Sequence, residues 1–251
     1  MIEDFELTLI VPVYEEEENI VPFLKEVIGK VKIPHKVLII YDRDEDSTLN
    51  KRKEAKSSHP NIAFVKNTYG TGIISALKTG FAKAGTKYIV PIMADLSDMP
   101  ETVNAMYQKI QEGYDLVVGS RYVKGGAKVG GSLVKFFLSR AANLSLHFLT
   151  RIPTHDMTNA FIMYRKEVLE WIDIRSTGGF EMTIEIIGKA YFHGYKITEV
   201  PTINRDRAAG KSKFKLLSWI LKYIYWYLYV FINFNKRRMM QIISRIKDEQ
   251  V

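Results

Sequence analysis

The sequence contains no cysteine in its 251 residues. This absence excludes disulfides, thiolate metal sites and a cysteine nucleophile, and it fits a reducing compartment. Histidine is scarce as well, and its five copies never fall at the close spacing of a zinc-binding helix. The N-terminus has an acidic stretch with no apolar segment after it, so we expect no secretory signal peptide.

Positive charge exceeds negative charge, with a formal net charge of +8 at pH 7. This balance favours an anionic partner such as a nucleotide, a phospholipid surface or a nucleic acid. No aromatic RNA-binding motif and no basic helix of a known kind supports the last of these, so we expect no nucleic-acid partner. The hydrophobic share of 47% and the charged share of 25% are typical of a globular protein with a substantial core.

Apolar runs and helical periodicity alternate along the first half of the chain. Strands are predicted at 7–14, 37–41, 62–65, 88–93 and 116–118, and amphipathic helices at 20–31, 72–84 and 101–111. Such alternation predicts an α/β fold with a mainly parallel sheet covered by helices on both faces. Further helices are expected at 133–149 and 180–192, further strands at 161–164 and 195–200, and a basic loop at 201–213.

Acidic residues follow three of the predicted strands. The pairs are Glu15 and Glu16, Asp42 and Asp46, and Asp95 and Asp98. Parallel α/β sheets bind ligands at the carboxyl ends of their strands, so three acidic tips at one edge predict a site for a metal ion and a sugar nucleotide. Each pair alone could instead begin a turn or lie in the first turn of a helix, where the helix dipole favours negative charge.

The C-terminal tail combines a polar stripe with a high density of aromatic residues. Lysine and serine side chains recur at spacings of four and three from Lys211 to Lys222, on one face of a predicted helix. Residues 223–235 carry no charge, and seven of these 13 residues are aromatic. Such a basic amphipathic helix is typical of a membrane interface, so we expect it to lie flat on the membrane with the catalytic domain on the cytoplasmic side. The alternatives are a helix that spans the bilayer and a helix that docks on the protein's own core or on a second subunit.

Six short motifs occur along the chain. They are PVYEEEEN at 12–19, YDRDEDST at 41–48, MADLSDMPE at 93–101, GSRY at 119–122, DMTNAF at 156–161 and RAAGKSK at 207–213. In this order they resemble P-x-Y-N-E-x-E-N, D-D-x-S-x-D-x-T, D-A-D-L-Q-H-P-P-E, G-S-R-Y, D-x-T-S-G-F and R-x-x-G-x-S-K. Those are motifs of the family 2 glycosyltransferases, and the closest group is the dolichol-phosphate mannose synthases and other polyprenyl-phosphate glycosyltransferases.

This resemblance implies a Rossmann-like GT-A fold over residues 1–213, followed by an amphipathic, membrane-associated segment at 214–251. It also implies an inverting transfer of a sugar, either mannose or another hexose. The donor would be a GDP- or UDP-linked sugar, and the acceptor a polyprenyl or dolichyl phosphate in a membrane. Mg²⁺ or Mn²⁺ would be the cofactor.

The resemblance also assigns roles to individual residues. The donor nucleotide is expected to contact Pro12, Val13, Tyr14, Glu16, Asp42 and Asp46. Asp95 is expected to hold the metal ion, with Ser97 or Asp98 contributing directly or through water. The acceptor phosphate is expected to contact Arg121, Lys135, Arg207, Ser212 and Lys213. The expected catalytic residues are Asp95, Arg121 and Arg207.

Several positions depart from the family motifs. Met93 replaces the first acid of the D-x-D motif, Ser97 replaces its Gln, and Tyr41 and Asn159 replace motif residues elsewhere. A thioether sulfur is a poor ligand for hard cations, so Asp95 is left as the remaining metal carboxylate. Two other activities stay open: transfer to a soluble or glycan acceptor, and nucleotide-sugar binding with weak catalysis, which the loss of the acid at position 93 suggests.

Overall fold

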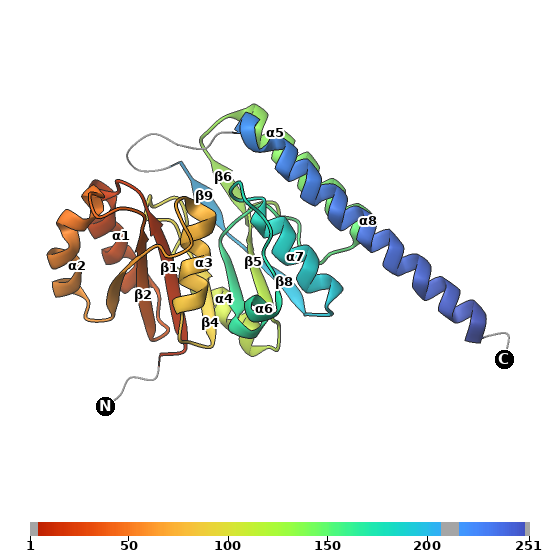
Figure 1. Cartoon of the computed structure of the whole chain (residues 1–251), viewed down its shortest axis with the longest axis horizontal. Helices are drawn as coiled ribbons and strands as arrows, with labels where there is room; N and C mark the ends of the chain where they lie inside the picture. Colours follow the sequence, from red (N-terminus) through yellow and green to blue (C-terminus); the bar gives the residue numbers. More distant parts are fainter. Residues whose placement is uncertain (1–4, 207–215, 249–251) are drawn as a thin grey trace.

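The computed structural model describes residues 5–206 and 216–248 (Figure 1). The strands are β1 (Leu7–Val13), β2 (His35–Tyr41), β3 (Ile62–Lys66), β4 (Tyr88–Pro91), β5 (Leu116–Ser120), β6 (Ala127–Val129), β7 (Ile162–Arg165), β8 (Ile197–Pro201) and β9 (Ile203–Arg205). The helices are α1 (Glu17–Lys30), α2 (Arg52–Ser58), α3 (Ile73–Lys83), α4 (Thr102–Gln111), α5 (Leu133–Thr150), α6 (Lys166–Trp171), α7 (Met182–Phe192) and α8 (Leu216–Asp248), with a short 3₁₀ helix, η1, at Ser47–Lys51.

Seven strands form the central sheet in the order β3-β2-β1-β4-β7-β5-β8. β1 pairs in parallel with β2 on one side and with β4 on the other, and β5 pairs in parallel with β8. Among these seven strands, β7 alone runs antiparallel to its neighbours. The prediction of a mainly parallel sheet is confirmed, and the carboxyl ends of β2, β1 and β4 lie side by side at one edge.

Successive residues of the central strands build an apolar core on each face of the sheet. Leu9 and Val11 of β1 lie in one core together with Phe23 of α1 and Val103 of α4. Ile10, which lies between them in sequence, belongs to the other core with residues of α3, α7 and α8. The sheet is therefore buried on both faces, as continuous apolar strands predict.

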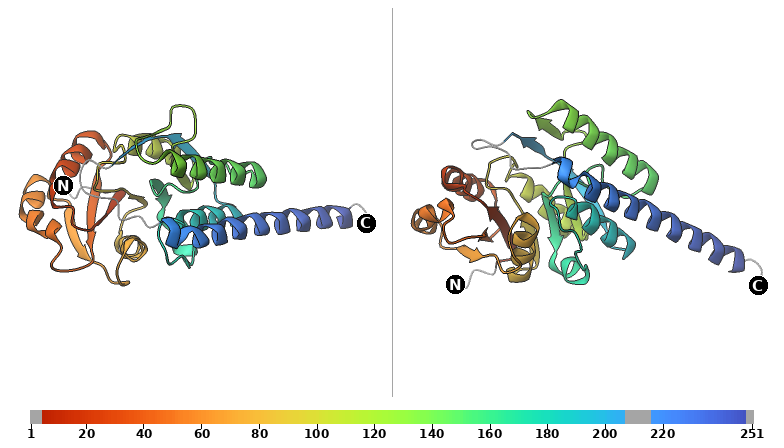
Figure 2. Two further views of the ribbon diagram at one scale, coloured as in Figure 1. Left: turned by 90° about the horizontal axis from the view of Figure 1, so that it is seen from above. Right: turned by 45° about the horizontal axis from the view of Figure 1, so that its top comes forward.

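The two longest helices, α5 and α8, lie side by side, and α8 extends well past the sheet (Figure 2). α8 packs on α7 through Trp226 and Val230, which are both buried. Gly188 of α7 lies so close to α8 that a Cβ there would overlap Val230. The Tyr227 hydroxyl of α8 lies 2.9 Å from the Ser145 hydroxyl of α5. Within residues 5–206 and 216–248, no helix is both long enough and apolar enough to cross a bilayer.

Two short strands were not predicted, because they exist only through pairing with each other. β6 lies in the glycine-rich stretch 124–131 and β9 in the predicted basic loop 201–213, and they pair in parallel. Three residues are too few for an apolar periodicity to reveal a strand. The predicted boundary between residues 213 and 214 lies just before α8, yet the buried face of α8 belongs to the same core as the sheet.

Candidate active site at the carboxyl edge of the sheet

The acidic tips of β1, β2 and β4 lie at neighbouring strand ends, because β1 lies between the other two. Asp46, after β2, accepts hydrogen bonds from the backbone N–H of Glu15 (3.1 Å), after β1, and of Thr48 (2.9 Å). Asp46 is only 6% exposed. This carboxylate therefore joins the loops that follow β1 and β2, and its contact with a nucleotide stays a prediction.

Asp42 connects the same region to the start of α3. Its two carboxylate oxygens accept hydrogen bonds from Asn67 Nδ2 (2.8 Å) and from the backbone N–H of Gly72 (2.7 Å). Gly72 has a φ of +90°, a conformation that glycine adopts without steric cost, and it immediately precedes α3. Asp42 thus lies at the positive end of the α3 dipole, and its contact with a nucleotide stays a prediction.

The end of β1 carries the remaining residues predicted to contact the nucleotide. Pro12 and Val13 are the last two residues of β1 and pair with β2. Tyr14 is 37% exposed, and its hydroxyl accepts a 2.6 Å hydrogen bond from Arg43. Glu16 immediately precedes α1, and its carboxylate accepts a hydrogen bond from a side chain in the first turn of that helix. An exposed aromatic ring beside a strand end provides a surface on which a planar base can stack.

The loop after β4 presents Asp95 at the middle of this edge. Asp95 is half-buried, and its Oδ1 accepts a hydrogen bond from the backbone N–H of Ser97 at 3.1 Å. Leu96, between them, has a φ of +60°, which is uncommon for a residue other than glycine and turns the chain sharply. Asp95 and Ser97, the two predicted metal ligands, therefore lie in one tight turn.

Asp98 lies in the same loop but is buried, with 7% of its surface exposed. Its Oδ2 accepts a long 3.4 Å hydrogen bond from the Met93 backbone N–H, and its Oδ1 accepts a 3.2 Å bond from Asn204 of β9. Burial, followed by the negative charge of Asp95, raises the pKa of Asp98 to about 6. The two hydrogen bonds and the charge of Arg121 act in the opposite direction.

The donor atoms of this loop fit a hard divalent cation that also binds a diphosphate. Among the described residues, no three His, Cys, Asp or Glu side chains gather closely enough to hold a metal ion by themselves. Mg²⁺ in phosphate-binding sites commonly takes only one or two protein carboxylates, with substrate phosphate and water as its other ligands. Asp95 and Ser97 offer a carboxylate and a hydroxyl in one turn, and both are suitable oxygen ligands.

Arg121, immediately after β5, forms a buried ion pair with Asp156. Its Nε and Nη2 donate to the two carboxylate oxygens at 2.7 and 2.8 Å, and its backbone N–H donates to one of them at 3.1 Å. The side chain of Asp156 is 0% exposed and that of Arg121 is 11% exposed. Burial alone would lower the pKa of Arg121, but the charge and hydrogen bonds of Asp156 raise it above its ordinary value. The guanidinium is therefore fixed in one orientation, and its Nη1 makes no hydrogen bond to any residue that the structure describes.

Helices α5 and α7 hold the segment 156–158, which pairs with Arg121. Asn143 of α5 accepts a 2.6 Å hydrogen bond from the backbone N–H of Met157. Thr183 of α7 donates a 2.7 Å hydrogen bond to the Met157 carbonyl. The orientation of the Arg121 guanidinium therefore depends on how these two helices are packed.

The first turns of α8 approach the same cation. Burial, followed by the charge of Glu181, raises the pKa of Tyr223 above its ordinary value, while the positive charge of Arg121 opposes this shift. Tyr223 of α8 thus lies near both Glu181 and Arg121. Residues of α5, α7 and α8 thus lie beside the Arg121–Asp156 pair or the segment that holds it.

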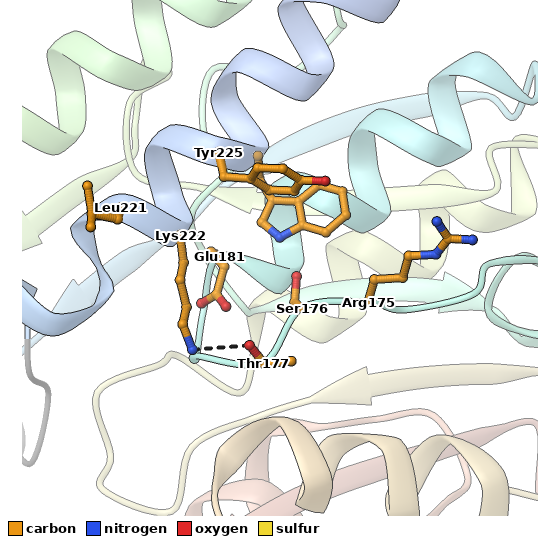
Figure 3. Close-up of a pocket in the computed structure, with 8 residues that line it drawn as sticks. Arg175, Ser176, Thr177, Glu181, Leu221, Lys222 and Tyr225 are labelled. Atoms are coloured by element: carbon orange, nitrogen blue, oxygen red, sulfur yellow. Dashed lines mark hydrogen bonds between the residues drawn. The ribbon is translucent and has the colours of Figure 1, made fainter.

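A pocket of about 370 Å³ lies between α8 and the loop before α7 (Figure 3). It is lined by Arg175, Ser176, Thr177, Glu181, Leu221, Lys222, Tyr225 and Trp226. Lys222 crosses from α8 to this loop and donates a 3.1 Å hydrogen bond to the Thr177 hydroxyl. None of the predicted site residues that the structure describes lines this pocket.

Most of the predicted acceptor contacts cannot be placed. Arg207, Ser212 and Lys213 lie outside the described residues, and Lys135 lies in the first turn of α5 with its side chain outside the description. β9 leads toward the RAAGKSK motif, and the backbone N–H of Arg205 donates to the Ser97 carbonyl at 2.9 Å. The strand that precedes the basic motif is therefore bonded directly to the loop of Asp95.

Two residues of the site were missed in the sequence. Asp156 is the first residue of the DMTNAF motif, so the motif carried a signal, although no role was assigned to it. Asn204 lies in a stretch that was expected to be a loop, and no local pattern marks it. Both residues act by fixing charged side chains of the predicted site.

Comparison with known proteins identifies the family of this chain. The family model for glycosyl transferase family 2 matches residues 8–172. A dolichol-phosphate mannosyltransferase of Pyrococcus furiosus is 29% identical over 214 residues, which are 83% of this chain and 59% of that protein. A polyprenol monophosphomannose synthase of Mycolicibacterium smegmatis is 31% identical over 211 residues, 82% of this chain and 79% of that protein. The chain thus spans 59% of the length of the Pyrococcus relative.

Solved structures share the fold. Glucosyl-3-phosphoglycerate synthase from Mycobacterium tuberculosis, in complex with Mn²⁺, UDP and glucosyl-3-phosphoglycerate, matches with a TM-score of 0.68 and 16% identity, covering 90% of this chain and 80% of that chain. At this identity the likeness shows the fold alone. The strand order, the acidic edge and the helices on both faces define a protein of the GT-A fold. The chain belongs to glycosyl transferase family 2, as the sequence motifs predicted.

Proposed function

We propose that this protein transfers a hexose from a nucleoside diphosphate sugar to a polyprenyl phosphate. Two relatives are named for mannosyl transfer to dolichol phosphate and for polyprenol monophosphomannose synthesis. The proposal rests on the position of Arg121 beside two helices that expose apolar side chains. The helices beside this cation, α5 and α8, expose apolar side chains on their outer faces. A group suited to a phosphate therefore lies next to a surface suited to a lipid chain.

The outer face of α8 is a continuous apolar stripe. Its exposed members recur at helical spacing and include Ile224, Leu228 and Ile232. The exposed apolar residues of α5 are Leu133, Val134, Phe137, Leu138, Phe148 and Leu149. Exposed apolar surface of this extent marks an interaction site. We propose that the two helices lie flat on a membrane with these faces in the interface, and that the active site lies above the cytoplasmic leaflet.

The donor would lie along the carboxyl edge of the sheet. Its base and ribose would contact the ends of β1 and β2, and its diphosphate would reach Asp95 and Ser97 at the end of β4. A bound Mg²⁺ or Mn²⁺ would neutralise charge that develops on the leaving diphosphate. Asp95 would hold this cation, and Ser97 would do so directly or through water.

Transfer would be a single displacement. An oxygen of the acceptor phosphate attacks the anomeric carbon while the bond from that carbon to the diphosphate breaks, and the electron pair leaves with the nucleoside diphosphate. Attack from the opposite side inverts the anomeric centre. The acceptor needs no strong general base, because a phosphate monoester with a second pKa of about 6 is largely ionised near neutral pH.

The main task of the protein is then to bring together two anions that repel each other. Arg121 supplies a guanidinium that Asp156 holds in place. Lys135, Arg207, Ser212 and Lys213 are proposed to contact the acceptor phosphate from the same side.

The test is transfer to a lipid acceptor in vesicles. Protein is incubated with vesicles that contain polyprenyl phosphate, with Mn²⁺ or Mg²⁺, and with labelled GDP- and UDP-hexoses in turn. We expect labelled product in the organic phase with at least one donor. Label found only on a soluble acceptor, or no turnover with any donor, would contradict the proposal in favour of one of the two other activities.

The membrane surface is tested separately by vesicle flotation. Leu228→Asp combined with Ile232→Asp should release the protein from vesicles and lower activity on long-chain acceptors more than on short soluble analogues. The matched control is Trp171→Asp, because Trp171 is a 73% exposed apolar residue that belongs to α6 and not to α5 or α8. Equal flotation of all three proteins would contradict the proposed surface.

A further inference from the structure

The loop after β4 has the same number of carboxylates as the family motif, but in different places. Where the motif reads D-A-D-L-Q-H, residues 93–98 of this chain read M-A-D-L-S-D. Met93 replaces the first acid, and Asp98 stands where the motif has His. An acid is lost at one end of the segment and gained at the other.

Asp98 folds back onto the position where the acid is missing. Its Oδ2 lies 3.4 Å from the backbone nitrogen of Met93, and its Oδ1 lies 3.2 Å from Asn204 Nδ2. Both distances are at or beyond the long end of the usual range for N–H···O hydrogen bonds. Asp98 is only 7% exposed. Two long hydrogen bonds compensate only weakly for the loss of hydration of its buried carboxylate.

Within the described part of the chain, a cation compensates this buried charge only in part. Arg121 attracts Asp98, but its guanidinium already forms a bidentate ion pair with Asp156. The charge of Asp95 instead repels Asp98. A divalent cation at Asp95 and Ser97 would attract both carboxylates and would offset their repulsion.

β9 fixes Asp98 in this position. Besides its contact with Asp98, Asn204 Nδ2 lies 3.3 Å from the Ser97 carbonyl, and the Arg205 backbone N–H donates to the same carbonyl at 2.9 Å. The two residues of β9 thus hold both Ser97 and Asp98. Groups outside the coordination shell tune a metal site, and here a neighbouring strand fixes the position of such a group.

We propose that Asp98 supplies, from outside the coordination shell, the negative charge that the family motif places at position 93. Asp98 is buried and both of its oxygens lie toward protein N–H groups, so we assign it a positioning role in which Asn204 keeps it in place. This inference rests on the proposed function, because it concerns the cation held at Asp95 and Ser97. In this chain the carboxylate of Asp98 thus takes the place of the motif acid that Met93 replaces.

The experiment measures Mn²⁺ affinity of the full chain by electron paramagnetic resonance, with UDP and separately with GDP. Asp98→Asn removes the charge and keeps the size, and it should weaken Mn²⁺ binding about tenfold, as outer-shell substitutions commonly do. Adding Met93→Asp to that variant should restore binding close to the wild-type level. The matched control is Asp173→Asn, the same charge change at a side chain that is 74% exposed, which should leave the affinity unchanged.

Unchanged Mn²⁺ affinity in a folded Asp98→Asn variant would overturn the inference, and so would failure of Met93→Asp to restore it. If Asp98→Asn does not fold, Met93→Asp with Asp98→His restores the family residues at positions 93 and 98 and should bind Mn²⁺ like the wild type; a folded but non-binding swap overturns the inference. Wild-type protein that binds no Mn²⁺ with either nucleotide overturns it as well.

Failure of the proposed function gives a different pattern. Wild-type protein that binds Mn²⁺ but forms no lipid-linked product would refute the lipid acceptor and leave the role of Asp98 intact. Formation of lipid-linked product, together with normal Mn²⁺ affinity in Asp98→Asn, would refute the role of Asp98 alone.

Discussion

Replacing Asp156 by Asn tests how strongly the structure holds Arg121. The carboxylate is fully buried and the guanidinium is 11% exposed, so solvent screens the pair only slightly. Removing one partner of a buried ion pair typically destabilises a protein by about 3–5 kcal/mol, because the other charge stays buried without compensation. With a urea dependence of about 3 kcal/mol per molar, the unfolding midpoint should fall by about 1–2 M.

The assay is urea unfolding followed by circular dichroism, with matched variants of the same pair. Asp156→Leu combined with Arg121→Met replaces both charges by apolar side chains and should recover most of the lost stability, since apolar replacement of a buried pair is often close to neutral. A loss below about 1 kcal/mol in Asp156→Asn is the range of exposed pairs and would refute the argument from burial. Failure of the double variant to recover would show that the neighbouring hydrogen bonds, and not the charge, account for the loss.

Three further predictions concern separate parts of the chain. Asp95→Asn keeps the size of the predicted metal ligand and should weaken Mn²⁺ binding and transfer by more than the roughly 100-fold limit of outer-shell changes; near-normal activity would exclude the assignment. Arg207→Ala should cost about 1.5–3 kcal/mol in kcat/KM for the lipid acceptor and leave donor affinity unchanged; calorimetry showing weaker nucleotide binding would move this residue to the donor side. Burial lowers the pKa of His35, so below about pH 6.5 the unfolded chain binds more protons than the folded chain. The free energy of unfolding therefore decreases as the pH is lowered. His35→Gln should reduce that fall between about pH 7.5 and 5, and parallel urea midpoints for the two proteins would contradict it.

The sheet could be predicted because its signals are local. Each central strand is a short apolar run, and each following helix repeats its apolar residues with the helical period. The position of Asp95 followed from the same logic, since the residue after a parallel strand lies at the carboxyl edge. No tertiary information was needed to place the candidate site at this edge of the fold.

The partners within the site could not be predicted in this way. Asp46 bonds the loop of Glu15 across 31 residues, and Arg121 pairs with Asp156 across 35 residues. Such contacts depend on how loops from different strands pack, and a single sequence does not record this. Asp46 therefore belongs to a motif predicted to bind a nucleotide, while its contacts in the structure hold the loop of Glu15. Nucleotide binding and loop support by Asp46 need separate tests.

α8 connects the proposed membrane surface to the acceptor side, because one helix carries both. The inner face of α8 is fixed by close packing on α7. Gly188 of α7 leaves room for Val230 of α8, and a larger residue at position 188 would overlap it. On the same helix, Tyr223 lies near Arg121, and Lys222 bonds the loop before α7. The outer face of this helix is apolar over the same turns. If α8 lies on a membrane as proposed, lipid contact and the placement of Arg121 involve one rigid element. A polyprenyl phosphate would then meet its cation at the membrane surface, without leaving the bilayer.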